Sequence, residues 1–160
     1  MNYRIIEEKD NSILAQIIRD NLKAHNLDIP GTVYFDEAVT HLSDYYLANP
    51  EKRTYYVILD ESNNVIGGIG LDKLDFMPDT AELQKLYLTD KAKGSGLSYK
   101  LMDLIENTAR DMGYKQMYLE THDNLAAAIH VYKKCGYKEI DRPEAVVHSS
   151  MNRFYLKVLK

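Results

Sequence analysis

The sequence predicts an α/β fold, with a single mixed central sheet of about seven strands flanked by four helices. Runs of β-branched and aromatic residues alternate with segments whose apolar residues recur at helical spacing. One strand, residues 81–88, is followed by a glycine-containing turn, a helix and a further strand at 116–121. Such a unit joins two parallel strands by a right-handed crossover. The 160-residue chain has no repeat or linker, so we expect a single domain over residues 1–160.

The first half of the chain contains two predicted helices and three predicted strands. A strand near residues 3–8 precedes a helix that begins at Asn11 or Ser12, because apolar residues then repeat every three or four positions. A second helix is expected over residues 36–48. Two β-branched and aromatic runs follow, with a turn-forming stretch between them, which predicts a hairpin of strands 54–60 and 65–74.

The second half continues with alternating strands and helices. After strand 81–88, the apolar face of a helix runs from Leu97 to Met112 and ends at Gly113, because glycine readily takes the left-handed conformation of helix ends. Strand 116–121 precedes a helix that begins near Leu125 and ends at Gly136. The last expected strands are 137–140 and 152–159.

Composition argues against several classes of function. The net charge of -4 provides no broad basic surface, which argues against nucleic-acid binding. No segment approaches the roughly 20 apolar residues that span a bilayer. The only cysteine is Cys135 and the polar N-terminus does not resemble a signal peptide, so we expect a cytoplasmic protein. The five histidines form no metal-ligand pattern, and no metal is expected.

The strand at 81–88 changes its apolar parity. Ala81 and Leu83 occupy odd positions, whereas Leu86 and Leu88 occupy even ones. Because side chains alternate between faces with a period of two, this change requires an extra residue near positions 84–85, which indicates a β-bulge. A bulge would bend the strand away from its neighbour and free a backbone amide. Alternatively, the side chains at positions 85 and 87 simply face solvent.

The turn after this strand, "DKAKGSGLSYKLM" at residues 90–102, contains two glycines and two lysines before a helix. A helix N-terminus exposes unpaired N–H groups and attracts anions. Gly94 and Gly96 would let a diphosphate approach the amides of residues 93–98, with Lys91 and Lys93 adding positive charge. Taken alone, such a turn is more often ordinary loop geometry. It matches neither a P-loop nor a dinucleotide-binding motif.

Two quoted segments resemble the GNAT superfamily of N-acetyltransferases: "ELQKLYLTDKAKGSGLSYKLM" and "MYLETHDNLAAAIHVYKKCGYKEI". That family has an Arg/Gln-x-x-Gly-x-Gly/Ala turn that binds the pyrophosphate of acetyl-coenzyme A. Lys91, Gly94 and Gly96 occupy these places, with lysine as a departure. The resemblance covers residues 54–158 and extends to the first 50 only in general layout. It implies a GNAT fold whose sheet is splayed between its fourth and fifth strands.

The resemblance also implies where acetyl-coenzyme A binds. Pantetheine would pair with the main chain of Leu86, Tyr87 and Leu88, where one amide would polarise the thioester carbonyl. The diphosphate would lie against the turn formed by Lys93, Gly94, Ser95, Gly96, Leu97 and Ser98.

Two residues are candidates for acid–base catalysis by the same resemblance. Tyr132 occupies the place of the family's tyrosine that protonates the departing thiolate, although helical spacing alone would make it a core residue. Glu82 matches a glutamate that serves some relatives as a base, directly or through water; a solvent-facing carboxylate is an equal alternative. Glu120 is the next candidate.

Several other polar residues remain open. Asn124 sits eight residues before Tyr132 rather than the family's seven, and could equally be a helix N-cap. His122 and His130 lie near the expected cleft without a clear role. Cys135 is expected to be a small packed residue rather than a nucleophile.

The expected function is transfer of an acetyl group from acetyl-coenzyme A to a small-molecule amine, by direct attack in a ternary complex. Carboxylates beside aromatic rings suit an ammonium group, and the first part of the chain contains such a set: Asp28, Tyr34, Phe35, Asp36, Glu37, Asp44, Tyr45 and Tyr46. The alternatives are acetylation of a protein or peptide amine, a coenzyme A binding module without turnover, and an unrelated nucleotide-binding domain. The resemblance also allows a homodimer.

Overall fold

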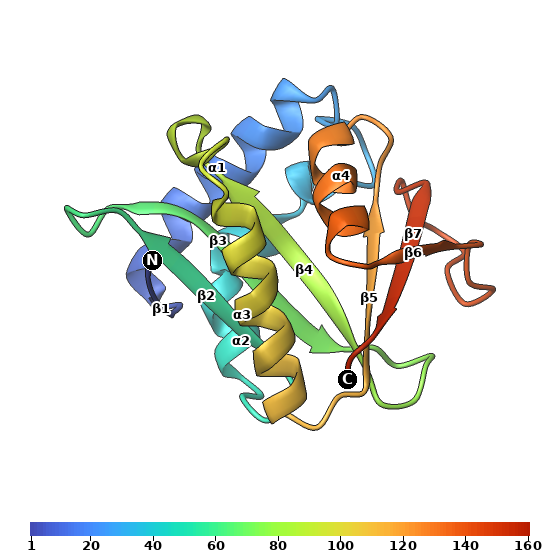
Figure 1. The fold of residues 1–160 in the computed structure, drawn as a ribbon. Helices are drawn as coiled ribbons and strands as arrows, with labels where there is room; N and C mark the ends of the chain where they lie inside the picture. The colour runs from blue at the N-terminus through green and yellow to red at the C-terminus, as the bar shows by residue number, and fades with distance from the viewer.

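A seven-stranded mixed sheet forms the centre of the computed structural model, which describes residues 1–160 (Figure 1). The strand order is β1-β2-β3-β4-β5-β7-β6. The strands are β1 (Asn2–Ile5), β2 (Thr54–Leu59), β3 (Val65–Lys73), β4 (Thr80–Leu88), β5 (Gln116–Thr121), β6 (Lys138–Ile140) and β7 (Arg153–Val158). Only β4 and β5 pair in parallel, and every other neighbouring pair is antiparallel. The mixed sheet and its parallel pair are therefore confirmed.

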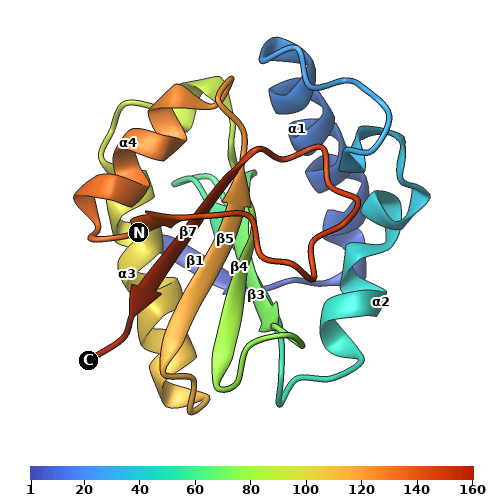
Figure 2. The same cartoon turned by 90° about the vertical axis from the view of Figure 1, so that its right-hand side faces the viewer.

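Four α-helices cover the two faces of the sheet. They are α1 (Asn11–Ala24), α2 (Leu42–Leu47), α3 (Leu97–Asp111) and α4 (Ala126–Lys134). Figure 2 shows α1 and α2 on one face and α3 and α4 on the other. Each pair buries an apolar face against its own core, with 11 buried residues in the core of α1 and α2 and 18 in that of α3 and α4. None of the helices combines the length and the apolar character needed to cross a membrane.

The helix expected over residues 36–48 is wrong in its extent. A 3-10 helix, Glu37–His41, occupies the first part, and the α-helix covers only Leu42–Leu47. The Asp36 side chain accepts a hydrogen bond from the Ala38 N–H (2.9 Å), which favours a tight turn at this start. The backbone at His41 then leaves the helical region (φ -131°), so the two segments are separate.

The parallel pair β4–β5 separates after three residues. Thr80, Ala81 and Glu82 pair with residues 116–118, and no pairing follows. Beyond this point the two strands diverge toward their carboxyl ends (Figure 1). Open α/β sheets bind ligands where neighbouring strands part in this way.

A β-bulge interrupts the β3–β4 ladder at the predicted position. Lys85 and Leu86 of β4 together face Ile69 of β3, because the register shifts by one residue between Gly68 and Gly70. Lys85 has a left-handed backbone (φ 51°). Its carbonyl accepts a hydrogen bond from the Tyr55 hydroxyl (2.8 Å), a residue of β2.

The bulge also explains the change of parity. Ala81 and Leu83 before it, and Leu86 and Leu88 after it, all contact the same core beneath α3. Tyr87 instead packs against the core of α1 and α2, so the alternative in which it faces solvent is wrong.

Two glycines of β3 allow the Tyr55 side chain to pass over that strand toward the bulge. A Cβ atom at Gly68 would lie 2.3 Å from a ring carbon of Tyr55, and one at Gly70 would lie 2.6 Å from another. Both distances are shorter than any normal contact, so a side chain at either position would displace the ring.

We expect Gly68→Ala to destabilise the protein by about 1 to 3 kcal/mol, because overpacking of this size forces side-chain and backbone shifts. The free energy of unfolding in denaturant measures the effect. In a Tyr55→Leu background the same substitution should cost clearly less, since the ring that causes the clash is gone. Equal costs in the two backgrounds would contradict this explanation.

Candidate active site

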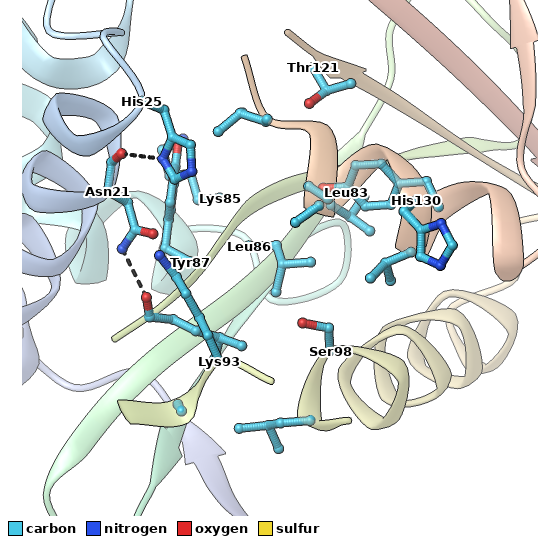
Figure 3. A pocket seen from close by; sticks show the side chains of 18 of the residues that line it. Asn21, His25, Leu83, Lys85, Leu86, Tyr87, Lys93, Ser98, Thr121 and His130 are labelled. Atoms are coloured by element: carbon cyan, nitrogen blue, oxygen red, sulfur yellow. Dashed lines mark hydrogen bonds between the residues drawn. The ribbon is translucent and has the colours of Figure 1, made fainter. Parts of the chain in front are cut away.

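A cavity of about 560 Å³ lies where β4 and β5 separate (Figure 3). Of its 24 lining residues, 14 are hydrophobic. The lining comes from the end of α1, β4 from Leu83 onward, the turn before α3 with the start of that helix, the end of β5, α4 with Leu125 before it, and Met151 of the loop before β7. Nearly all the predicted cosubstrate-binding residues line it: Leu86, Tyr87, Leu88, Lys93, Gly94, Gly96, Leu97 and Ser98. The exception is Ser95, whose hydroxyl donates a hydrogen bond to the Ala92 carbonyl (2.8 Å) and so braces the turn.

The turn before α3 presents free backbone donors to this cavity. Gly94 and Gly96 have left-handed backbones (φ 78° and 76°), and a Cβ atom on either would have no atom within 4 Å. Gly96 is the N-cap of α3 and no side chain caps the helix. The N–H groups of residues 94–98 donate no hydrogen bond within the protein. Open space, free donors and the helix dipole together suit a diphosphate.

Positive charge beside the turn comes from one predicted lysine rather than two. The Lys93 ammonium lies 3.2 Å from the exposed Asp90 carboxylate, and its side chain lines the cavity. Lys91 lies outside the lining.

The second half of β4 directs part of its main chain into the gap. The Thr89 N–H donates a hydrogen bond to the Ile66 carbonyl of β3 (2.8 Å). In an antiparallel pair, the N–H groups of successive residues point alternately toward and away from the neighbouring strand. The amides of Leu86 and Leu88 therefore face away from β3. The Asn21 side chain of α1 donates to the Leu88 carbonyl (2.9 Å), which confirms that direction. These amides can therefore pair with an extended chain lying between β4 and β5.

Tyr132 of α4 lines the same cavity. It is buried, yet its hydroxyl has no hydrogen-bond partner in the protein. Burial, with a smaller contribution from Tyr87, raises the pKa of the phenol well above its ordinary value. The hydroxyl is therefore protonated throughout the physiological range and free to donate a proton to a bound group.

The acetyltransferase (GNAT) family model matches residues 15–137. The chain belongs to this family. Membership makes the chain an acyltransferase with acetyl-coenzyme A as its cosubstrate, as the motifs predicted, and the cavity fits that molecule in its free amides and open gap. Among GNAT relatives, the chain is 31% identical over 134 residues to the uncharacterized N-acetyltransferase YjgM of Escherichia coli, covering 83% of this chain and 79% of the relative.

Solved GNAT structures have the same fold. A GNAT acetyltransferase from Staphylococcus aureus superposes with a TM-score of 0.86 over 99% of both chains at 23% identity. The PaiA N-acetyltransferase of Thermoplasma acidophilum, solved with coenzyme A, gives a TM-score of 0.76 over 99% of both chains at 18% identity. At such identities the likeness shows the fold alone.

The two carboxylates considered as the GNAT base lie in different surroundings. Glu82 does not line the cavity; its Oε1 accepts a hydrogen bond from the Gln84 amide (2.7 Å). Burial raises the pKa of Glu82, and the nearby Glu120 charge raises it further, against the lowering effect of Gln84. Glu120 does line the cavity, and its two oxygens accept hydrogen bonds from Tyr118 (2.9 Å) and Ser149 (3.0 Å).

The other polar residues considered from the sequence differ in whether they line the cavity. His130 lines the cavity, whereas His122, Asn124 and Cys135 do not. Asn124 is not the N-cap of α4, which is Leu125; its amide instead donates to the His25 carbonyl at the end of α1 (2.9 Å). Cys135 packs against the core, and burial raises the pKa of its thiol.

The acidic and aromatic set of the first 50 residues lies outside the lining of this cavity. None of its eight members lines the cavity. The Tyr45 hydroxyl donates a hydrogen bond to the Asp72 carboxylate. Tyr46 is buried, and its hydroxyl donates a hydrogen bond to the Gln84 side-chain oxygen (2.6 Å).

The lining residues that sequence reasoning missed as parts of the site include the polar residues Asn21, His25 and Lys85. The His25 Nδ1 atom lies 2.8 Å from the Asn21 carbonyl oxygen, which fixes the ring at the cavity edge. Asn21 and His25 are four positions apart on one face of the first helix, and this polar pair within an apolar pattern was the available signal.

Proposed function

We propose that the protein transfers the acetyl group of acetyl-coenzyme A to the primary amine of a small molecule, by direct attack in a ternary complex. One observation carries the proposal. The unpartnered Tyr132 hydroxyl lies in the same cavity as the free amides of β4 and of the α3 N-terminus. A binding module would need the amides but not the buried phenol.

The loop between β6 and β7, which contributes Met151 to the cavity lining, supports a small acceptor rather than a peptide. Figure 2 shows this loop, residues 141–152, reaching from the sheet toward α1 and α2. The Ser150 hydroxyl donates to the Gly31 carbonyl (2.9 Å), and Asn124 donates to the His25 carbonyl (2.9 Å). These hydrogen bonds join the α1–α2 loop to the loops on the far side of the gap, which restricts a long acceptor chain.

The residues supply the chemistry in three parts. The amides of residues 94–98 bind the diphosphate, and an amide of Leu86 or Leu88 donates to the carbonyl oxygen as negative charge develops there. A donor placed in this way is worth roughly 3 to 4 kcal/mol. Tyr132 donates its proton to the departing thiolate. Since the phenol is a weaker acid than a thiol, the proton moves late, as charge gathers on the sulfur.

Glu82 is the proposed proton acceptor, acting through a water because its side chain does not line the cavity. An acceptor amine with a pKa of about 10.4 is almost fully protonated near neutral pH, so some group must take up its proton. Burial raises the pKa of Glu82, which makes it a better base than an exposed carboxylate. The negative charge of the nearby Glu120 also raises the pKa of Glu82.

We expect Glu82→Gln to lower kcat by about 10²-fold near neutral pH. The deficit should shrink as the pH rises toward about 10, because the amine then loses its proton without help. In the wild type, activity should fall as the pH drops through a pKa above the ordinary carboxylate range, because only the ionised carboxylate accepts a proton. Steady-state rates across pH measure both effects.

Glu120→Gln is the matched control for this experiment, since it removes the neighbouring carboxylate that does line the cavity. A larger and pH-dependent loss in Glu120→Gln, with a normal profile in Glu82→Gln, would transfer the role to Glu120.

Thiol release from acetyl-coenzyme A, measured against a panel of small amines and peptides, tests the function as a whole. We expect release with small amines. Release with peptides alone would make the acceptor a protein or peptide amine. Binding of acetyl-coenzyme A without thiol release on any amine would instead support a module without turnover.

A further inference from the structure

Lys85 occupies a costly backbone conformation. It is the left-handed residue of the β4 bulge (φ 51°), a region that a residue with a Cβ atom enters at a cost of roughly 1 to 3 kcal/mol. Glycine would form the same bulge without that cost. A lysine at this position therefore points to a role for its side chain.

The Lys85 ammonium has no polar partner. It makes no hydrogen bond and no ion pair with the protein, and its only contact of this kind is with the face of the Tyr46 ring, whose centroid lies 5.9 Å away. Burial lowers the pKa of the lysine, against the opposing effect of three carboxylates nearby. Each of these is already engaged elsewhere: Glu82 with Gln84 (2.7 Å), Asp36 with the Ala38 N–H (2.9 Å) and Asp72 with Arg53 (3.3 Å).

Lys85 lines the cavity beside α1. In the close-up view it lies with His25 on the α1 side, and Thr121 at the end of β5 lies on the opposite side (Figure 3). Glu120, the residue before Thr121, also lines the cavity. The lining of the cavity thus includes both a cation, Lys85, and a carboxylate, Glu120.

We propose that Lys85 binds the carboxylate of the acceptor, and that the acceptors are amino acids or other small amines that carry a carboxylate. The inference rests on the proposed function for its amine. An acceptor carboxylate would give the ammonium the charge-assisted hydrogen bond that the protein does not supply. The same acceptor would hold its amine toward the carboxylates of β4 and β5, at the side where the thioester is expected.

Matched acceptor pairs test the proposal. Amino acids are compared with the amines formed by their decarboxylation and with their amides, using kcat/KM for thiol release. We expect kcat/KM in the wild type to be about ten- to hundredfold higher for the carboxylate-bearing member, because only that member can accept a hydrogen bond from the charged Lys85. Lys85→Met, which keeps the apolar stem, should lose that preference, so that kcat/KM falls much more for the carboxylate-bearing member of each pair than for the decarboxylated amine. Lys85→Arg should retain most of it.

Lys73→Met is the matched control, because it removes an exposed lysine from the neighbouring strand β3. It should keep the wild-type preference. Equal kcat/KM for both members of each pair in the wild type would overturn the role of Lys85 and leave the proposed function standing. Loss of turnover on decarboxylated amines in both Lys85 variants would also overturn it, since the lysine would then act in proton transfer.

Calorimetry separates the inference from the proposed function. Amino acids are titrated into the protein saturated with coenzyme A, so no turnover is needed. Binding that Lys85→Met weakens about tenfold or more supports the carboxylate site even if no amine is acetylated. Equal affinity in the wild type and Lys85→Met, or no binding to either, would overturn it.

Discussion

Replacing Tyr132 by phenylalanine is expected to lower kcat by about 10²- to 10⁴-fold, the usual contribution of a positioned proton donor. The substitution removes a hydroxyl that has no partner in the protein, so folding and packing should hardly change. The dissociation constant of acetyl-coenzyme A should therefore remain close to that of the wild type. A fall in kcat without a change in affinity identifies an interaction made only in the transition state.

Single-turnover kinetics and calorimetry measure the two quantities. Tyr137→Phe is the control, since this tyrosine is also buried, packs near Tyr132 with ring centroids 6.1 Å apart, and does not line the cavity. It should leave kcat nearly unchanged. Wild-type turnover in Tyr132→Phe would remove this residue from the mechanism.

Gly94→Val should weaken binding of acetyl-coenzyme A by about tenfold or more, which corresponds to about 1.4 kcal/mol. The new side chain would enter the open space over the turn before α3, where the diphosphate is expected. Because the position is left-handed, the substitution also costs about 1 to 2 kcal/mol of stability.

Gly113→Val separates these two effects. Gly113 lies past the other end of α3, is also left-handed (φ 91°) and is equally free of neighbours within 4 Å of a Cβ atom. The Gly113→Val variant should lose a similar amount of stability in thermal unfolding, and it should keep the wild-type affinity for acetyl-coenzyme A in calorimetry. An unchanged affinity in folded Gly94→Val would place the diphosphate elsewhere.

Local sequence patterns were sufficient for the strands, the glycine turn and the bulge. The bulge was predictable because it changes the parity of Ala81 and Leu83 relative to Leu86 and Leu88, and parity is a property of one strand. The second helix was predicted too long, since apolar spacing does not distinguish a 3-10 start from an α-helix.

Contacts between distant segments could not be predicted in the same way. Asn21 reaches the Leu88 carbonyl across 67 positions of sequence, and no local pattern specifies such a pair. Glu82 lies on the predicted strand, but it does not line the cavity, and its carboxylate accepts a hydrogen bond from Gln84, which no local pattern specifies. Lys85 was read only as a marker of the bulge, because neither its burial nor its lack of partners can be known before the surrounding helices are in place.

The hydrogen bond from the Tyr55 hydroxyl to the Lys85 carbonyl fixes the bulge from a strand that contributes nothing to the cavity. If β4 continued from Gln84 without the bulge, Leu86 and Leu88 would lie on the opposite face of the sheet from Ala81 and Leu83, and their amides would turn toward β3. A hydrogen bond from β2 thus helps to set which amides of β4 face the cavity. The direction of the Leu86 and Leu88 amides therefore depends on Tyr55, a residue of the amino-terminal half of the chain.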